Sequence, residues 1–134
     1  MFFLNYGIES FAGMHPTIHI KRVYDPPLKT DRYRVLVDRL WPRGLTKEEA
    51  EIDEWAKDIA PSPDLRKWFG HKPEHWSVFQ KKYTLELSAN EAVDAFITRH
   101  EKQKLITLVY AAKDEAHTHA IVLQQYLQKR FQSR

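Results

Sequence analysis

The sequence predicts a small single domain of the α/β class, in which three or so mostly parallel strands are packed by about five helices. The chain has 134 residues, 43% of them hydrophobic, which is enough for one domain with its own core. It contains both strand-like segments and segments of helical periodicity. In addition, residues 35–44 and 105–114 share one pattern, in which an apolar strand ends in a charged turn and the turn opens a helix.

The first two strands are predicted from residues 17–24 and 32–38. Residues 17–24 alternate apolar and polar side chains, which is typical of a half-buried strand. Residues 25–27 end this strand, because two of them are prolines and proline cannot donate to a strand ladder. The connection is about eight residues long, which is too short for the helical crossover between parallel neighbours. We therefore expect the two strands to be antiparallel neighbours or not to be adjacent.

A helix is predicted to begin at Thr46, because residues 46–49 form a T-x-x-E capping box. The acidic side chains that follow crowd its first turns, where the helix dipole favours negative charge. We expect this helix to extend to about Ala60, and Pro61 ends it. Its expected apolar face is formed by Ile52, Trp55 and Ile59.

The rest of the chain predicts four further helices and one strand. A short helix is capped by Ser62, has Pro63 at its first position and is closed by Gly70. The remaining segments predict a helix from near residue 73, a helix over about 90–101, a strand over 105–110 and a last helix over about 114–131. The strand is continuously apolar, so we expect it to be central and buried on both faces.

The composition excludes several classes of protein. The chain has no cysteine, which excludes disulfides, thiolate metal sites and a cysteine nucleophile, and fits a cytoplasmic protein. No apolar run approaches the roughly 20 residues of a membrane span, so no membrane partner is expected. Residues 1–13 are apolar but lack the basic start of a signal peptide. They are interpreted as an N-terminal extension, disordered or artefactual, and residues 14–134 as the single α/β domain.

The formal net charge of +3 is unevenly distributed along the chain. Residues 1–47 carry a net charge of +4, residues 48–64 of −6 and residues 65–134 of +5. The basic residues therefore surround the two charged turns, whereas the acidic residues fill one predicted helix. This distribution permits binding of phosphate or nucleic acid, although the acidic segment weakens a continuous basic surface.

The two charged turns form the candidate site. In α/β proteins, ligands bind outside the carboxyl ends of parallel strands, where the following helices direct their free N–H groups. An arginine fork binds phosphate or carboxylate through two parallel hydrogen bonds. We therefore predict a site for a phosphate- or carboxylate-bearing ligand, formed by Asp38, Arg39, Trp41, Arg43 and Lys113.

Most of these charged and aromatic residues also have a structural interpretation. Arg39 would pair with Asp38 or with the acidic helix, and Arg43 would be solvated. Trp41 would belong to the core, as a tryptophan beside a proline commonly does in a small aromatic-rich protein. Asp114, at the start of the last predicted helix, would serve as its N-cap.

His117 is the candidate general acid or base, because imidazole titrates near neutral pH and this residue is predicted in the first turn of the last helix. Asp114 or Asp38 would orient it, and water would attack, since no covalent nucleophile is evident. His117 and His119 are two residues apart on the predicted helix and cannot chelate one ion together. The sequence contains no metal-binding or nucleotide-binding motif, so neither a metal nor a cofactor is predicted.

Three stretches of the sequence, VDRLWPRG, KDIAPSPDLRKWFGH and TLVYAAKDEAHTHA, resemble the YeaO-like branch of the domain-of-unknown-function 488 family. The resemblance covers residues 17–128 and implies a small α/β cytoplasmic protein of bacterial type, without an assigned activity. Another branch of that family has cysteines and a Cys-His-Arg run in its last strand–helix segment. The corresponding residues here are Tyr110, Thr118, His119 and Ala120. Thiol chemistry suggested for those relatives therefore does not transfer to this chain.

The leading hypothesis is a module that binds an anionic small molecule at the carboxyl edge of the sheet. One alternative is a metal-independent hydrolase of an anionic substrate, with His117 as general acid or base. The other is a nucleic-acid or protein-interaction module that uses the basic stretch over residues 21–47. The sequence predicts neither catalysis nor an oligomeric state.

Overall fold

Four parallel strands form the sheet in the order β1-β4-β2-β3. The computed structural model describes residues 15–133, and the predicted extension over residues 1–13 lies outside them. The strands are β1 (Thr17–Arg22), β2 (Tyr33–Leu36), β3 (Glu54–Trp55) and β4 (Leu105–Tyr110). The predicted α/β class is therefore confirmed, and β4 has the predicted central position, buried between two parallel neighbours.

The first two strands are not adjacent, which is the second of the two expected arrangements. β4 lies between them, so that Ile20 of β1 and Val35 of β2 both pair with Leu108. Residues 23–32, which include the 3-10 helix η1 (Lys29–Asp31), return the chain to the start of β2. They need no helical crossover, because an extended segment of this size spans the length of a short strand.

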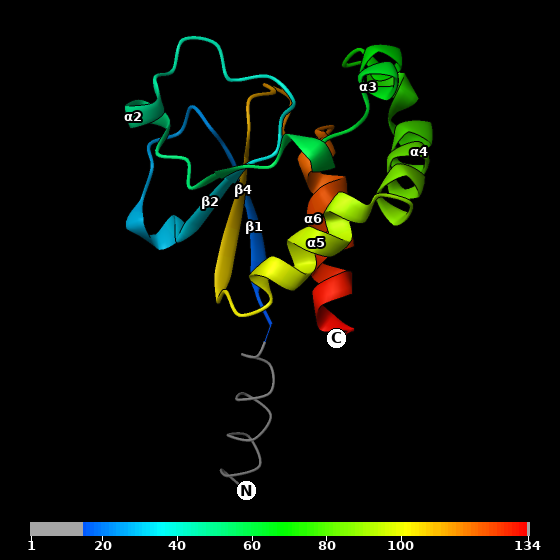
Figure 1. Cartoon of the computed structure of the whole chain (residues 1–134). Coiled ribbons are helices and arrows are strands. Elements are labelled where there is room, and N and C mark those ends of the chain that lie inside the picture. Colours follow the sequence, from blue (N-terminus) through cyan, green and yellow to red (C-terminus); the bar gives the residue numbers. More distant parts are fainter. Residues whose placement is uncertain (1–14, 134) are drawn as a thin grey trace, which may run out of the picture.

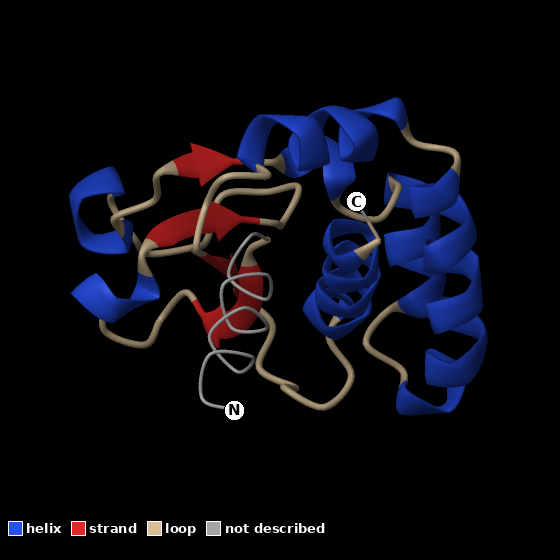
Figure 2. Cartoon of the chain, turned by 90° about the horizontal axis from the view of Figure 1, so that it is seen from below, coloured by secondary structure: helices blue, strands red, loops and turns tan. Residues whose placement is uncertain are grey.

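Four helices cover one face of the sheet (Figure 1, Figure 2). They are α3 (Pro63–Phe69), α4 (Trp76–Ser88), α5 (Glu91–His100) and α6 (His119–Gln132), with the 3-10 helices η2 (Lys57–Ile59) and η3 (Pro73–His75) preceding α3 and α4. Of the described residues, the other face carries η1, the one-turn helix α2 (Lys47–Ala50) and loops (Figure 2). The loops that follow β2 and β4 both lie at the upper end of the sheet in Figure 1, where the strands end.

The helix predicted over residues 46–60 is wrong beyond its first turn. The Thr46 capping box forms as predicted, but α2 ends at Ala50, and Glu51 adopts a left-handed conformation. The chain then pairs with β2 as β3, through the hydrogen bonds Asp53 N to Arg34 O and Ala56 N to Leu36 O. Sheet pairing therefore overrides the local helical pattern. The three residues assigned to one helical face separate as a result: Ile52 and Ile59 pack in different cores, and Trp55 is exposed.

The last helix begins at His119 rather than near Asp114. Thr118 is its N-cap, and the Thr118 hydroxyl accepts a hydrogen bond from the backbone N–H of Ala120. Asp114 instead caps a separate turn, because its carboxylate accepts hydrogen bonds from the backbone N–H groups of Ala116 and His117. This local side-chain bonding competes with helix formation. His117 consequently lies in the loop before α6 and not in its first turn.

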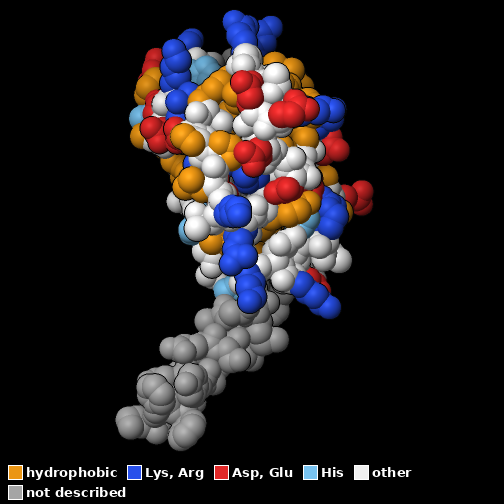
Figure 3. Space-filling view, turned by 90° about the vertical axis from the view of Figure 1, so that its left-hand side faces the viewer, with side chains coloured by type: hydrophobic (Ala, Val, Ile, Leu, Met, Phe, Trp, Pro, Cys, Tyr) orange, Lys and Arg blue, Asp and Glu red, His pale blue; other side chains and the backbone are white. Residues whose placement is uncertain are grey.

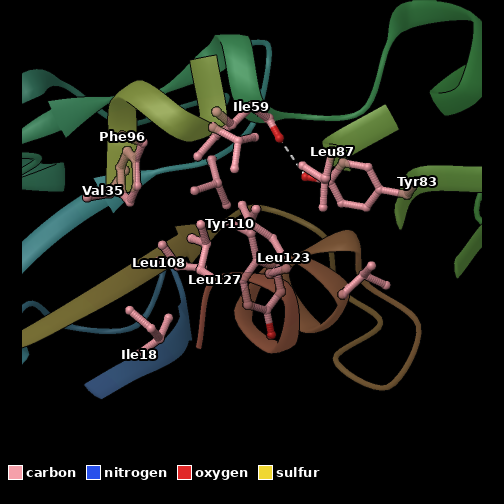
Figure 4. Packing of buried hydrophobic residues seen from close by; sticks show 14 of the residues in the cluster. Ile18, Val35, Ile59, Tyr83, Leu87, Phe96, Leu108, Tyr110, Leu123 and Leu127 are labelled. Atoms are coloured by element: carbon pink, nitrogen blue, oxygen red, sulfur yellow. Dashed lines mark hydrogen bonds between the residues drawn. The ribbon is translucent and has the colours of Figure 1, made fainter. Parts of the chain in front are cut away.

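The main hydrophobic core lies between the sheet and α3–α6. Figure 4 shows side chains from the strands and from the helices in one cluster, which includes Leu108 of β4 and Leu127 of α6. The buried Tyr83 hydroxyl of α4 donates a hydrogen bond of 2.6 Å to the carbonyl of Ile59 (Figure 4). This bond fixes α4 to the segment that leads into α3, and burial raises the pKa of Tyr83 well above its ordinary value.

A buried ionic network lies on the opposite face of the sheet. Arg34 of β2 donates to Asp31 Oδ2 at 2.7 Å, to the carbonyl of Ala50 at 2.8 Å and to that of Glu51 at 3.0 Å. Lys21 of β1 also contacts the Asp31 carboxylate, at 3.0 Å. Burial raises the pKa of Asp31, but the hydrogen bonds that it accepts outweigh this effect and lower the pKa overall. The network attaches α2 and η1 to the sheet.

Candidate functional site

A cavity of about 360 Å³ opens at the carboxyl edge of the sheet. Three parts of the chain form most of its lining: the loop after β2, the loop after β4 and the segment from η2 to the end of α3. The lining residues are 38–43, 60–61, 111–112 and 117–119, together with Tyr24, Arg66, Phe69, His71 and Phe79. The cavity therefore lies where the strand–turn pattern of the sequence locates the candidate site.

The structure brings together five of the seven predicted site residues. Asp38, Arg39, Trp41, Arg43 and His117 all line the cavity. Lys113 and Asp114 belong to the same loop as His117 but do not contribute to the lining. Lys113 is exposed to solvent, and Asp114 reaches the cavity only through its contact with His117.

Arg39 connects the loop after β2 to the segment that precedes α3. Its Nε donates to the carbonyl of Pro61 and its Nη2 to the carbonyl of Ala60, both at 3.2 Å. Neither of the acidic partners considered from the sequence is used. Because these two nitrogens already have protein acceptors, Arg39 shapes the wall of the cavity and offers only part of its fork to a ligand.

Arg43 and Arg66 are the exposed arginines of the cavity. Within residues 15–133, neither side chain makes a hydrogen bond or an ion pair. The backbone of Arg43 is nevertheless fixed, because its carbonyl accepts a hydrogen bond of 2.8 Å from the Tyr24 hydroxyl. Arg66 projects from α3, whose ends are fixed by the predicted caps, Ser62 and Gly70. Both guanidinium groups are therefore free to bind an anion from a positioned backbone.

Asp38 connects the ends of β2 and β4. Its Oδ2 accepts a hydrogen bond of 2.9 Å from the backbone N–H of Ala111. Its Oδ1 is buried and lies 3.2 Å from Nε2 of His119. That nitrogen also lies 2.9 Å from the carbonyl of Val37, which can only accept, so Nε2 carries a proton. His119 thereby holds the start of α6 against the end of β2.

Trp41 combines a structural role with a position in the cavity. Its indole N–H donates to the carbonyl of Leu45 at 2.7 Å, and its ring contacts Trp55 edge to face. It also packs against the smaller hydrophobic cluster on the α2 face of the sheet. The core interpretation of Trp41 is therefore shown, and the same ring forms part of the cavity wall.

His117 and Asp114 form a hydrogen-bonded pair beside the cavity. His117 Nδ1 lies 2.8 Å from Asp114 Oδ2, and this hydrogen bond is the main cause of the lowered pKa of the Asp114 carboxyl. Because a carboxylate only accepts, Nδ1 carries the proton and Nε2 is the nitrogen left to exchange one. The imidazole also contacts Trp76 edge to face.

Sequence reasoning missed Tyr24, Arg66 and His71 as cavity residues. Arg66 belongs to α3, and His71 belongs to the turn that follows it. The sequence predicted this helix but not its position relative to the sheet. The signal for their position is β3, because the segment after a parallel strand begins at the carboxyl edge of the sheet. Interpreting residues 54–55 as helix removed that signal.

Residues 15–133 contain no group of three or more histidine or acidic side chains arranged to hold a metal ion. In the same part of the chain, no helix has the length and apolar character needed to cross a membrane.

The fold and the cavity define a small α/β domain with a basic site at the carboxyl edge of a parallel sheet. Residues 17–134 match the family described as "Inactive DUF488-N3 subclade", and the chain belongs to this family. The predicted resemblance to the domain-of-unknown-function 488 family is thus confirmed.

The chain matches its curated relatives over nearly the whole of their length. The uncharacterised protein YeaO of Escherichia coli (strain K12) is 43% identical over 110 residues, which are 82% of this chain and 96% of YeaO. Uncharacterised proteins of Mycobacterium bovis and Mycobacterium tuberculosis (strain H37Rv) are each 38% identical over 113 residues, or 84% of this chain and 95% of the relative. No solved structure has significant similarity to the chain.

Proposed function

We propose that this protein binds a small anion, with a phosphate or carboxylate group, in the cavity at the carboxyl edge of its sheet. The observation that carries the proposal is the pair of arginines without protein partners, Arg43 and Arg66, at one cavity. Among the described residues, one carboxylate lines the cavity, that of Asp38: its Oδ2 accepts from Ala111 N–H, and its Oδ1 is buried 3.2 Å from His119 Nε2. The charge available to a ligand is therefore positive.

The size of the cavity supports a small-molecule ligand. Its volume of about 360 Å³ lies within the range of roughly 300–1,000 Å³ of known small-molecule sites. The walls are held by side-chain hydrogen bonds of Tyr24, Arg39 and Asp38 to backbone groups, so the cavity is largely preformed. A preformed site loses less conformational entropy when its ligand binds.

The comparisons favour binding over catalysis. The family is described as an inactive subclade, and this description fits a protein that keeps a ligand site without a reaction. Relatives occur in bacteria, and we propose that the protein acts in the cytoplasm, in line with its lack of cysteine.

The arrangement of surface charge favours a small ligand over nucleic acid. Figure 3 shows acidic and basic side chains interspersed over the face of the molecule that carries α2. A nucleic-acid interface needs a continuous basic stripe that follows the phosphate backbone. The acidic residues of the segment 48–64 interrupt such a stripe on this face.

Isothermal titration calorimetry with inorganic phosphate at low ionic strength tests the proposal. We expect phosphate to bind, and Arg43→Ala or Arg66→Ala to weaken its affinity by about tenfold or more, since a hydrogen bond to a charged group contributes about 1.5–3 kcal/mol. The matched control is Lys81→Ala, which removes an exposed positive charge from α4 outside the cavity. Affinity that is unchanged in both arginine variants, or lowered equally by Lys81→Ala, would contradict the assignment of the site.

A hydrolase of an anionic ester is the second candidate function, and the hydrogen bond between His117 and Asp114 favours it. In that case His117 Nε2 would take a proton from the attacking water, and the ester would be cleaved to an alcohol and an acid. The expected result is turnover of p-nitrophenyl phosphate that His117→Ala reduces by about 10²–10⁴-fold. Turnover that survives in His117→Ala would refute this role of the histidine.

A further inference from the structure

The lining of the cavity changes in character with depth. Its most buried members are mainly apolar: Phe79 is 1% exposed, and Pro42, Pro61 and Phe69 are also buried. Thr118 is a buried polar member, and its hydroxyl accepts a hydrogen bond from the N–H of Ala120. The Phe69 and Phe79 rings stack with their centroids 4.4 Å apart and their planes within 23°. This buried, mainly aromatic and prolyl part of the lining is called the floor of the cavity.

The rim of the cavity carries the unpaired positive charge. Arg43, Arg66 and His71 are exposed members of the lining, and they come from the loop after β2, from α3 and from the turn that follows α3. Leu40 of the same loop as Arg43 also lines the cavity and is 60% exposed, although it is a large hydrophobic residue that belongs to neither core cluster. A ligand that enters the cavity thus passes a rim that is both basic and apolar.

The polar groups beneath the rim are largely engaged within the protein. The carbonyls of Ala60 and Pro61 accept from Arg39, and Asp38 Oδ2 accepts from the N–H of Ala111. Asp38 Oδ1 has no hydrogen-bond partner within residues 15–133, and as a carboxylate oxygen it disfavours an anionic group beside it. A charged ligand group placed at the floor would lose its hydration without finding partners, which is costly. An apolar ligand group placed there would bury its surface against the phenylalanine rings, which is favourable.

We infer that the ligand is a ring-bearing anion, whose flat apolar part faces the Phe69–Phe79 floor and whose phosphate or carboxylate lies at the rim near Arg43 and Arg66. This inference rests on the proposed function and adds the orientation and the chemical class of the ligand. The volume of about 360 Å³ is near the lower end for such sites and suits one ring system with one anionic group. Mononucleotides and aromatic acids share this chemistry.

Calorimetric titration with a matched series of anions tests the inference. The series comprises inorganic phosphate, glycerol phosphate and phenyl phosphate, with acetate and phenylacetate as the carboxylate pair. We expect phenyl phosphate to bind at least about tenfold more tightly than glycerol phosphate, because burial of the ring surface adds to the affinity of the anionic group. The affinities for adenosine and uridine monophosphates are then compared with those for phenyl phosphate and phenylacetate. This comparison shows whether the ring of the ligand belongs to a nucleotide or to an aromatic acid.

Two variants separate the ring from the charge. Phe69→Leu is expected to reduce the preference for phenyl phosphate while leaving the affinity for inorganic phosphate unchanged, whereas Arg66→Ala is expected to weaken both. Phe96→Leu, at a buried core position outside the cavity lining, is the matched control for Phe69→Leu. Equal affinity for phenyl phosphate and glycerol phosphate would overturn the inference and leave the proposed function standing. Failure of every anion to bind would overturn both.

Discussion

Replacing Arg34 with alanine is expected to lower the free energy of unfolding by about 3–5 kcal/mol. The Arg34 side chain is only 4% exposed and makes three hydrogen bonds, to Asp31, Ala50 and Glu51. Its removal takes the Arg34 donors away from the carbonyls of Ala50 and Glu51 and leaves Lys21 as the remaining cationic partner of the Asp31 carboxylate. The loss is large because a buried charge that loses a partner keeps its desolvation cost.

Urea denaturation of the wild type and of two variants measures this effect. Arg99→Ala is the matched control, because Arg99 also pairs with a carboxylate, that of Glu54, but its side chain is 49% exposed. Solvent screens such a pair, and we expect its removal to cost only about 0.2–1 kcal/mol. If Arg34→Ala destabilised the protein no more than Arg99→Ala, the network would not be what attaches α2 and η1 to the sheet.

Phe79→Ala is expected to be similarly destabilising, by about 3–5 kcal/mol, because it removes a buried ring and leaves a cavity. Phe79 lies at the centre of an aromatic group, with ring contacts to Phe69, Trp76 and Tyr83. It belongs both to the main core and to the floor of the ligand cavity. The same substitution would therefore weaken the fold and deepen the candidate site.

Thermal and urea unfolding of Phe79→Ala, compared with Leu85→Ala, test this prediction. Leu85 lies on the same helix, and because it is 70% exposed, its truncation is expected to change stability by no more than about 0.5 kcal/mol. Phe79→Leu should fall between the two variants, since it retains part of the buried volume. Comparable stability of Phe79→Ala and Leu85→Ala would show that the aromatic group contributes little to the core.

Local signals in the sequence predicted most of the fold. These signals depend on interactions between residues that are close in the sequence. Examples are the Ser62 and Gly70 caps, the helical spacing from residue 76 onward and the apolar strand over residues 105–110. The segment after Ala50 could not be predicted in this way. There, pairing with β2 and the hydrogen bonds from Arg34 decide the conformation, and both depend on residues distant in the sequence.

The position of the candidate site was predictable for a topological reason. Asp38, Arg39 and His117 follow strands that end at the same edge of a parallel sheet, so their convergence does not depend on details of the loops. The orientation of individual side chains does depend on them. The turn capped by Asp114 keeps Lys113 outside the cavity, whereas β3 brings Arg66 to it, and neither event is encoded in a local motif.

The most direct test of the central claim is to locate the bound anion by a phosphate titration of ¹⁵N-labelled protein, followed by nuclear magnetic resonance. We predict that the largest amide shifts occur at Arg43, His71 and Ala112, which surround the cavity, and that Lys81 and Arg130 remain unaffected. The same titration of Arg66→Ala should require a higher phosphate concentration for half-maximal shift. Shifts confined to residues outside the cavity, or the absence of any saturable shift, would contradict an anion site at this edge of the sheet.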